Sequence, residues 1–277
     1  MGELMTAKGF VGAAGFLVFM IAGGLLGTAS AQYSFSGDAA VVSKYIWRGQ
    51  RLTNDWSLQP AMTVGYGGFA FNAWGTMDLA AVNPGTAFAD LQGRFSEIDY
   101  TFSYDHSLEN VSVGGGVIFY TFPDRFNTTT EIYGTVGFDS VPLAPSATVY
   151  VDVDETTAGG GTAGVYILFG AGHSFETGSD IFTGLDLSGT FALATDGFTN
   201  FYYGSTVGGG PHDASFTVSA PITINDNWSA GAFVTYSGLI GEDIRESQFQ
   251  DPREPARPTG ATYADTVWGG MSVSLTF

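Results

Sequence analysis

Ten charged residues recur along stretches of the chain in which apolar and polar side chains alternate. They are Asp38, Lys44, Arg48, Asp78, Glu97, Asp99, Glu131, Asp152, Asp154 and Asp186, and eight of the ten are acids. Fixed carboxylates along a narrow polar passage favour cations, because low-dielectric walls strengthen the field of each charge. If the ten side chains share one face, we expect them to line a cation-preferring passage. The alternative is that they only solvate an interior or pair with one another.

The histidines offer little for catalysis. His106 stands beside Ser107 in a predicted short turn, and His173 stands beside Ser174 on a predicted strand, where neighbours point to opposite faces. Neither pair places a nucleophile and a base on one face, as a hydrolytic triad requires. His212 falls in a long predicted loop, and the chain has no cysteine to bind a metal through thiolate. We therefore predict no catalytic residue, no metal site and no cofactor.

The elements that would position these residues are predicted to be strands, because the pattern has a period of two from end to end. In residues 35–48 the apolar and aromatic side chains share one parity, and Asp38, Lys44 and Arg48 share the other. Twelve such segments are predicted, at 35–48, 57–66, 68–79, 95–104, 110–121, 129–139, 146–154, 164–175, 180–193, 214–224, 228–238 and 264–277. A thirteenth, Phe201 to Val207, is assigned to a loop because Tyr202 and Tyr203 break the alternation.

Length and composition decide between two all-β folds. A soluble sandwich also alternates, but strands of about ten residues suffice to cross a bilayer at a tilt. Gly at 40 residues and charged residues at 13% also differ from a soluble domain, in which about 25% of residues are charged. We predict an all-β fold, a closed antiparallel transmembrane β-barrel of twelve strands. The net charge of −18 argues against a nucleic-acid partner.

The first 31 residues differ from the rest. Lys8 precedes an apolar run from Phe10 to Leu26, which is followed by Ala29-Ser30-Ala31. This layout predicts a signal peptide, residues 1–31, cleaved before Gln32, with an uncleaved membrane anchor as the alternative. Residues 32–277 would then form the barrel.

The predicted connections fall into two classes. Short turns lie at 66–68, 105–110, 139–145, 176–179 and 225–227, and the longest connections lie at 80–94, 194–213 and 239–263. This asymmetry is typical of bacterial outer-membrane barrels, in which the short turns are periplasmic and the long loops extracellular. We therefore expect the chain in the bacterial outer membrane, with outer-membrane lipid as a partner.

Six further arginines fall at the predicted extracellular ends, and no base falls in the short turns. They are Arg51, Arg94, Arg125, Arg245, Arg253 and Arg257. Because a guanidinium can bind phosphate through two parallel hydrogen bonds, we expect these residues to face lipopolysaccharide. The alternative is that long loops simply hold more charges of both signs.

The chain closes on Phe277, which ends an alternating strand. A terminal aromatic residue in this position resembles the signal that the outer-membrane assembly machinery reads. Phe277 is therefore predicted to be an assembly signal.

A motif near the first strand carries a family resemblance. Val42-Ser43-Lys44-Tyr45-Ile46-Trp47-Arg48-Gly49 resembles the V-S-x-Y-x-x-R-G opening of a family of bacterial outer-membrane porins of the TorF type. The resemblance implies a barrel and a channel, without a substrate. Together with the acid-rich parity, it predicts passive diffusion of small hydrophilic solutes with a preference for cations. The alternative is a structural or partner-binding barrel with a plugged lumen, in which the loops 194–213 and 239–262 contact the partner.

Overall fold

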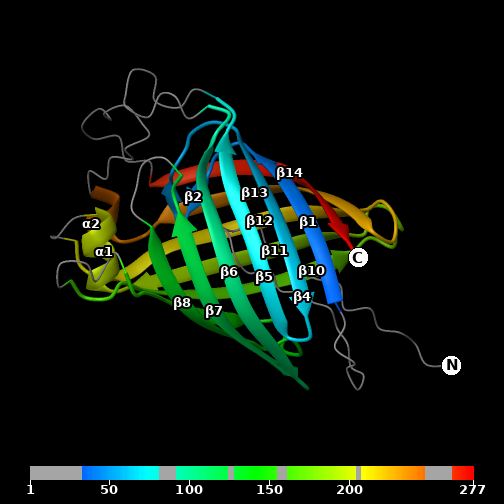
Figure 1. Ribbon diagram of the computed structural model, residues 1–277, viewed down its shortest axis with the longest axis horizontal. Coiled ribbons are helices and arrows are strands. Elements are labelled where there is room, and N and C mark those ends of the chain that lie inside the picture. The colour runs from blue at the N-terminus through cyan, green and yellow to red at the C-terminus, as the bar shows by residue number, and fades with distance from the viewer. Residues whose placement is uncertain (1–32, 81–91, 124–127, 155–160, 204–206, 247–263) are drawn as a thin grey trace.

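Twelve strands close into an antiparallel barrel, which confirms the predicted fold (Figure 1). The computed structural model describes residues 33–80, 92–123, 128–154, 161–203, 207–246 and 264–277, so the predicted signal peptide lies outside the described residues. The strands of the wall are β1 (Tyr33–Val42), β4 (Ser57–Tyr66), β5 (Phe69–Asp78), β6 (Phe95–Leu108), β7 (Val111–Thr121), β8 (Thr129–Gly137), β9 (Ser146–Asp152), β10 (Val165–Glu176), β11 (Gly184–Ala194), β12 (Gly210–Thr223), β13 (Trp228–Leu239) and β14 (Asp265–Thr276).

Each strand of the wall pairs with its neighbours in sequence, and β1 pairs with β14 to close the ring. The closing ladder runs from Ser36 opposite Thr276 to Val42 opposite Gly270. Closure matters because a lipid bilayer offers no partner to an unpaired backbone N–H or C=O group. Period-two alternation then sends every second side chain outward.

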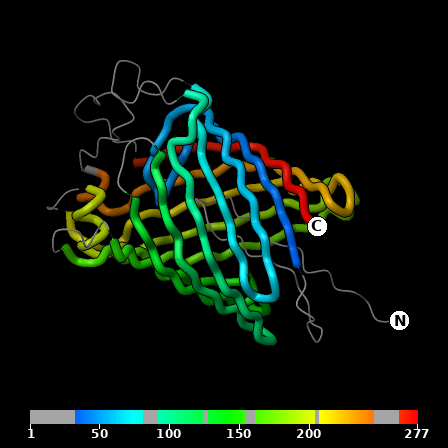
Figure 2. The backbone as a smooth tube through the Cα atoms, viewed as in Figure 1, coloured from blue at the N-terminus to red at the C-terminus, as the bar shows by residue number. Residues whose placement is uncertain are grey.

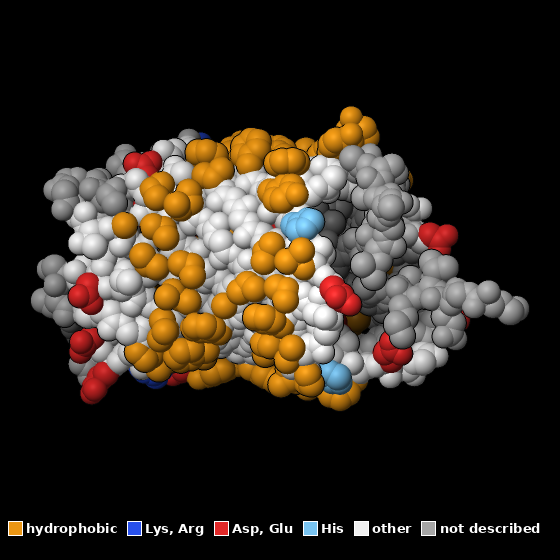
Figure 3. Space-filling view, turned by 90° about the horizontal axis from the view of Figure 1, so that it is seen from below, with side chains coloured by type: hydrophobic (Ala, Val, Ile, Leu, Met, Phe, Trp, Pro, Cys, Tyr) orange, Lys and Arg blue, Asp and Glu red, His pale blue; other side chains and the backbone are white. Residues whose placement is uncertain are grey.

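The outer surface carries hydrophobic side chains in bands that run around the barrel, with acidic side chains toward its two ends (Figure 3). Exposed aromatic residues mark one end of this surface: Tyr33 lies 4.6 Å from Tyr66 between ring centroids, and Phe69 lies 4.7 Å from Tyr104. Apolar bands flanked by aromatic residues match a membrane-spanning barrel. Among the described residues, no helix is both long and apolar enough to cross a membrane.

The two ends of the barrel differ. The end that bears α1 (Asp196–Tyr203) and α2 (Glu242–Glu246), here called the loop end, lies opposite the C-terminus, and the smooth tube of Figure 2 shows the same arrangement. At the other end, the turn end, the connections are residues 67–68, 109–110, 138–145, 177–183 and 224–227. His106 and Ser107, expected in a turn, belong to the long strand β6. The predicted asymmetry of short turns and long loops is present.

The first predicted strand is shorter than expected. It ends at Val42, and residues 43–56 form a segment, here called the plug hairpin, that contains β2 (Ile46–Trp47) and β3 (Gln50–Arg51). Ser43 ends the ladder by donating its N–H to the Gly269 carbonyl (2.8 Å) and accepting the Gly269 N–H at its hydroxyl (3.1 Å). The strand wall resumes at Ser57, which pairs with Val42. The prediction of a strand to residue 48 is therefore wrong.

A second difference lies between β11 and β12. Residues predicted as a surface loop form the helix α1, on which Phe198 and Thr199 are fully buried. The Thr199 hydroxyl donates to the Val207 carbonyl (2.8 Å) and joins the helix to the chain that leads into β12. An eight-residue helix with buried aromatic residues packs against the end of the barrel instead of extending from it.

Phe277 lies at the turn end, beyond the last residue of β14. Its N–H donates to the Phe35 carbonyl (2.9 Å), and its side chain is 68% exposed. We expect Phe277→Ala to change the free energy of unfolding by less than about 0.5 kcal/mol, as exposed substitutions usually do, while lowering the yield in the outer membrane. The measurement is the outer-membrane fraction by immunoblot beside thermal unfolding of refolded protein. Phe35→Ala, on the ring 6.2 Å away, is the matched control; equal yields for both variants would contradict the role of Phe277.

Candidate functional site

The plug hairpin inserts aromatic and aliphatic side chains into the loop end of the barrel. The Tyr45 ring is 1% exposed and lies 5.7 Å from the Trp74 ring on β5. Ile46 packs with Val42 and Trp268 in a small buried cluster. The hairpin is held in shape locally, because the Leu52 N–H donates to the Tyr45 carbonyl (2.8 Å) and the Tyr45 N–H donates to the Thr53 hydroxyl (3.0 Å). The plug hairpin is thus a folded segment that lies inside the barrel wall.

Arg48, at the tip of the plug hairpin, joins this segment to the wall. Its Nη1 donates to Glu131 Oε1 (2.7 Å) and its Nη2 donates to Glu131 Oε2 (2.6 Å). The Tyr120 hydroxyl also donates to Glu131 Oε2 (2.9 Å). This ion pair, here called the latch, is buried, with Arg48 8% and Glu131 1% exposed. Arg48 and Gly49 both have positive φ, 47° and 74°, which makes the sharp tip possible.

Four aromatic rings surround the Arg48 guanidinium. Its Cζ atom lies 4.4 Å from the Tyr166 ring centroid, 4.6 Å from Trp47, 4.8 Å from Tyr150 and 5.4 Å from Phe198. Burial lowers the pKa of Arg48 most strongly, but the charge and hydrogen bonds of Glu131, together with Tyr120 and Tyr166, outweigh burial and raise this pKa above its ordinary value. Cation–π contacts of this kind contribute about 0.5 to 2 kcal/mol. Arg48 therefore stays charged and satisfied inside the barrel.

The helix α1 covers the hairpin at the loop end. Its Phe198 ring stacks on Trp47 at 6.0 Å, and its Tyr202 ring lies 5.1 Å from Trp47. Burial raises the pKa of Tyr202 and of Tyr203 above the ordinary value, so both phenols stay neutral. Trp47 of the hairpin and the aromatic rings of α1 therefore pack in the larger buried cluster at the loop end of the barrel.

A second polar group lies beside the latch on β12. His212 Nδ1 and Asp213 Oδ1 are 2.7 Å apart, and the Tyr166 hydroxyl donates to the same Asp213 oxygen (2.8 Å). His212, expected in a long loop, lies at the start of β12 with its ring fully buried against Tyr166 and Phe198. Asp213 is thus a second buried carboxylate, and it contacts Tyr166, one of the rings around Arg48.

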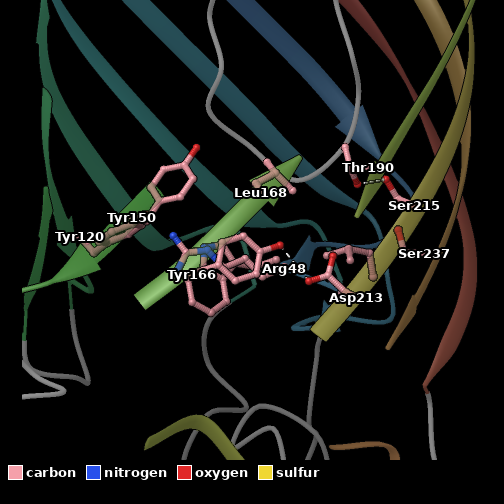
Figure 4. Close-up of a pocket in the computed structure, with 12 residues that line it drawn as sticks. Arg48, Tyr120, Tyr150, Tyr166, Leu168, Thr190, Asp213, Ser215 and Ser237 are labelled. Atoms are coloured by element: carbon pink, nitrogen blue, oxygen red, sulfur yellow. Dashed lines mark hydrogen bonds between the residues drawn. The ribbon is translucent and has the colours of Figure 1, made fainter. Parts of the chain in front are cut away.

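A small cavity of about 40 Å³ lies between the latch and the lumen. Arg48 and Tyr166 border one side of it, and Thr190, Ser215 and Ser237 border the other (Figure 4). Thr190 and Ser215 share a hydrogen bond of 2.7 Å between their hydroxyls. Toward the turn end, the inward face continues with small polar side chains and glycines, such as Thr217 and Thr235 at 2.8 Å. The plug hairpin therefore closes one end of the barrel, and hydroxyl side chains such as Thr190, Ser215 and Thr217 line the wall beside and beyond it.

The ten residues predicted to line a passage do not all lie together. Six acids are buried on the inward face of wall strands: Asp78, Glu97, Asp99, Glu131, Asp152 and Asp186. Asp38 lies on β1 opposite Ser274 and is half-buried. Asp154 is exposed beyond the end of β9, where its N–H donates to Asp152 Oδ1 (2.9 Å). Its predicted inward position is wrong because the strand ends at Asp152.

The two predicted inward bases also separate. Arg48 reaches the lumen from the plug hairpin instead of from β1. Lys44 lies beyond β1, and its Nζ donates to the Val267 carbonyl (3.0 Å) at the exposed edge of β14. The amine thus occupies a backbone acceptor that β1 leaves unpaired where it ends.

The arginines predicted to face lipopolysaccharide fall into three groups. Arg94 is exposed at the start of β6, and Arg245 on α2 pairs with Asp265 Oδ2 (2.6 Å) in a partly exposed position. Arg51 is 7% exposed inside the plug hairpin, so the expectation that it faces lipid phosphate is wrong. Arg125, Arg253 and Arg257 lie outside the described residues.

Comparison with known proteins places the chain in a family. The profile described as "Bacterial protein of unknown function (Gcw_chp)" matches residues 27–228. The chain belongs to the Gcw_chp family. None of the curated proteins matches it.

Among solved structures, the Gcw_chp chain is similar to the NanC porin, with 8% identity, a TM-score of 0.49, and coverage of 88% of this chain and 99% of that one. It is also similar to an outer membrane channel from Pseudomonas putida F1, with 9% identity, a TM-score of 0.44, and coverage of 88% and 95%. A third similar structure is a Pseudomonas aeruginosa FadL homologue, with 12% identity, a TM-score of 0.40, and coverage of 88% and 89%.

Sequence reasoning missed the aromatic part of the site in this Gcw_chp protein. Tyr120, Tyr150 and Tyr166 are inward-facing, and Tyr150 has the same parity as Asp152 on β9. That shared parity was a detectable signal, because aromatic side chains on a polar inner face have no lipid to meet. Asp213 had no such signal, since it was expected in a loop.

Gly49 allows a test of how tightly the plug hairpin fits. A Cβ atom added at Gly49 would lie 2.6 Å from Asp213 Cβ and 2.9 Å from Leu239 Cδ2, at a φ of +74°. Gly49→Ala should therefore displace the hairpin tip and weaken the latch by more than the roughly 1 to 2 kcal/mol of left-handed backbone strain. Thermal unfolding of the purified protein would report the change. Gly93→Ala is the matched control, because Gly93 has the same φ with open space around it; equal destabilisation would contradict a tight fit.

Proposed function

We propose that this protein is an outer-membrane channel for passive diffusion of small hydrophilic solutes, closed at its loop end by the plug hairpin. The observation that carries the proposal is the contrast within the lumen. The packed plug hairpin fills the loop end, while hydroxyl side chains and glycines line the wall toward the turn end. A barrel that served only as an anchor would need no hydrophilic lining, because a packed apolar interior would stabilise it more.

We expect that the plug hairpin can move out of the loop end. It is held by the Arg48–Glu131 ion pair, by ring contacts and by burial, and the chain contains no cysteine that could fix it covalently. Both ends of the hairpin return to paired strands, since Val42 lies opposite Ser57. The barrel wall therefore does not depend on the hairpin for closure. The resemblance of Val42–Gly49 to TorF-type porins is consistent with this proposal, because this motif covers the end of β1 and the first half of the plug hairpin.

The proposed setting is the bacterial outer membrane, with the loop end outside the cell. Outer-membrane lipid would contact the apolar bands, and lipopolysaccharide phosphate would contact Arg94 at the loop end. The assembly machinery would recognise Phe277. We expect a preference for cations because six acids are buried on the inward face of the wall.

A second candidate function is a partner-binding barrel that never opens. The observation that favours it is the depth of the packing: Tyr45, Phe198 and Ile118 are at most 1% exposed. In that case the loops around 194–213 and 239–262 would contact the partner.

Swelling of proteoliposomes separates the two candidates. Purified protein is reconstituted and diluted into isosmotic neutral sugars of increasing size. The channel proposal expects swelling that slows as the sugar grows, and faster swelling for Arg48→Ala. A folded barrel resists detergent until it is boiled, so it migrates differently on a denaturing gel before and after heating. Protein that lacks this difference in mobility serves as the unfolded control. If neither the wild type nor Arg48→Ala causes swelling, the result contradicts the channel and favours the closed barrel.

A further inference from the structure

The surroundings of Arg48 have the composition of a binding site for an organic cation. Glu131 contributes a carboxylate from β8, and Tyr150, Tyr166 and Phe198 contribute rings from β9, β10 and α1. These four residues, here called the cation cage, belong to the barrel wall and its covering helix. Arg48 itself belongs to the hairpin. The cage and its occupant are therefore separate parts of the molecule.

The contacts are specific for a planar guanidinium. Both Nη atoms of Arg48 face both oxygens of Glu131, at 2.7 and 2.6 Å, in the forked arrangement that a guanidinium makes with a carboxylate. An ammonium group is a point charge and cannot match this pair of parallel hydrogen bonds. Aromatic rings around a cation supply the remaining attraction through their electron-rich faces.

We propose that the cation cage binds solutes that carry a guanidinium group, and that Arg48 occupies it as a tethered ligand. A free solute of this class competes with Arg48 and releases the plug hairpin. The opening of the mouth by such a solute rests on the proposed channel function, whereas binding to the cage does not.

The neighbouring cavity indicates how the rest of such a solute would be accommodated. It opens beside Arg48 toward Thr190, Ser215 and Ser237, whose hydroxyls can donate and accept hydrogen bonds. Asp213 borders the same cavity with a second carboxylate. A guanidinium solute with a short hydrophilic tail therefore fits this chemistry better than an apolar one, and it would reach the cage from the lumen.

Tethering explains why the site is occupied at rest. A covalently linked group acts at an effective concentration of about millimolar or higher, so a free guanidinium must exceed that level to compete. Removing the Arg48 side chain removes the competitor and leaves Glu131 and its rings in place. The site should then accept the free ion.

The test measures binding of methylguanidinium to Arg48→Ala in detergent by isothermal titration calorimetry. Urea, which has a similar shape without charge, and methylammonium, which has charge without the fork, are the comparison ligands. We expect saturable binding of methylguanidinium, at least about tenfold tighter than to wild type, and no saturable binding of urea. Adding Glu131→Gln to Arg48→Ala should abolish it. Each protein is first checked for heat-dependent gel mobility.

Equal binding of urea, or equal binding after Glu131→Gln, would overturn the cation cage. If Arg48→Ala does not fold, Arg48→Gln replaces it, because glutamine keeps a long side chain without the charge. In the wild type, excess methylguanidinium should change the fluorescence of Trp47, and Trp47→Phe is the control. A wild-type bilayer recording with methylguanidinium distinguishes the two proposals. If methylguanidinium binds but induces no conductance, the result supports the cation cage and contradicts the channel. If Arg48→Ala conducts but does not bind methylguanidinium, the result supports the channel and contradicts the cation cage.

Discussion

Arg48→Ala is expected to raise the open probability of the barrel by about two to four orders of magnitude. Removing one partner of a buried ion pair costs about 3 to 5 kcal/mol, because the other charge is left buried without compensation. Here the charge left behind is that of Glu131. The substitution destabilises only the closed state, because the Arg48–Glu131 pair is already separated when the hairpin is released. Each 1.36 kcal/mol changes a population about tenfold. Single-channel recording in planar bilayers measures the effect.

Two further variants make this result specific to the latch. Glu131→Gln should open the barrel as Arg48→Ala does, and the double variant should be no more open than either single one, because interacting partners are not additive. Arg245→Ala is the matched control. Its pair with Asp265 has side chains 38% and 45% exposed, and such surface pairs contribute about 0 to 1 kcal/mol. An unchanged open probability for Arg48→Ala, or an equal rise for Arg245→Ala, would contradict the latch.

The open lumen is expected to prefer cations strongly in dilute salt and weakly in concentrated salt. The Debye length is about 30 Å at 0.01 M and about 3 Å at 1 M, so the field of the inward acids reaches across the lumen only in dilute salt. Reversal potentials of Arg48→Ala across a salt gradient give the selectivity. Glu97 and Asp99 lie two residues apart on the inward face of β6. Replacing them with Gln and Asn should lower the preference for cations several-fold.

The control for selectivity is Asp154→Asn, which removes a charge of the same sign from an exposed position beyond β9. It should leave the reversal potential nearly unchanged in concentrated salt and shift it less than the β6 pair does in dilute salt. Preference for anions, or indifference to both salt and the β6 pair, would contradict an acid-lined passage.

The barrel could be predicted because every strand repeats the same simple rule. Alternation placed one set of side chains toward lipid and the other inward, and it also assigned Glu97, Asp99 and Glu131 to the inner face on which they lie. The same rule failed between Val42 and Arg48. The alternation continues there without interruption, so nothing in the pattern marks where β1 leaves the wall.

What ends β1 is tertiary structure. Tyr45, which shares the apolar parity of residues 35–48, contacts Trp74 inside the barrel, and Arg48 pairs with Glu131, which lies 83 residues away in sequence. Contacts at this separation leave no local signal in one sequence. The helix α1 was hidden for a related reason, because its Phe198 and Tyr203 are stabilised by the hairpin and β12 rather than by a long amphipathic repeat.

Removing the plug hairpin while keeping the wall shows whether the hairpin closes a continuous passage through the barrel. Because Val42 and Ser57 are paired neighbours on β1 and β4, a short Asn-Gly turn can replace residues 44–55, as two-residue turns join antiparallel strands. The variant should keep its heat-dependent gel mobility. In a planar bilayer we predict discrete and long-lived conductance steps where the wild type opens rarely. A folded variant that stays as silent as the wild type would show that the barrel has no continuous passage behind the hairpin, and would contradict the proposed channel.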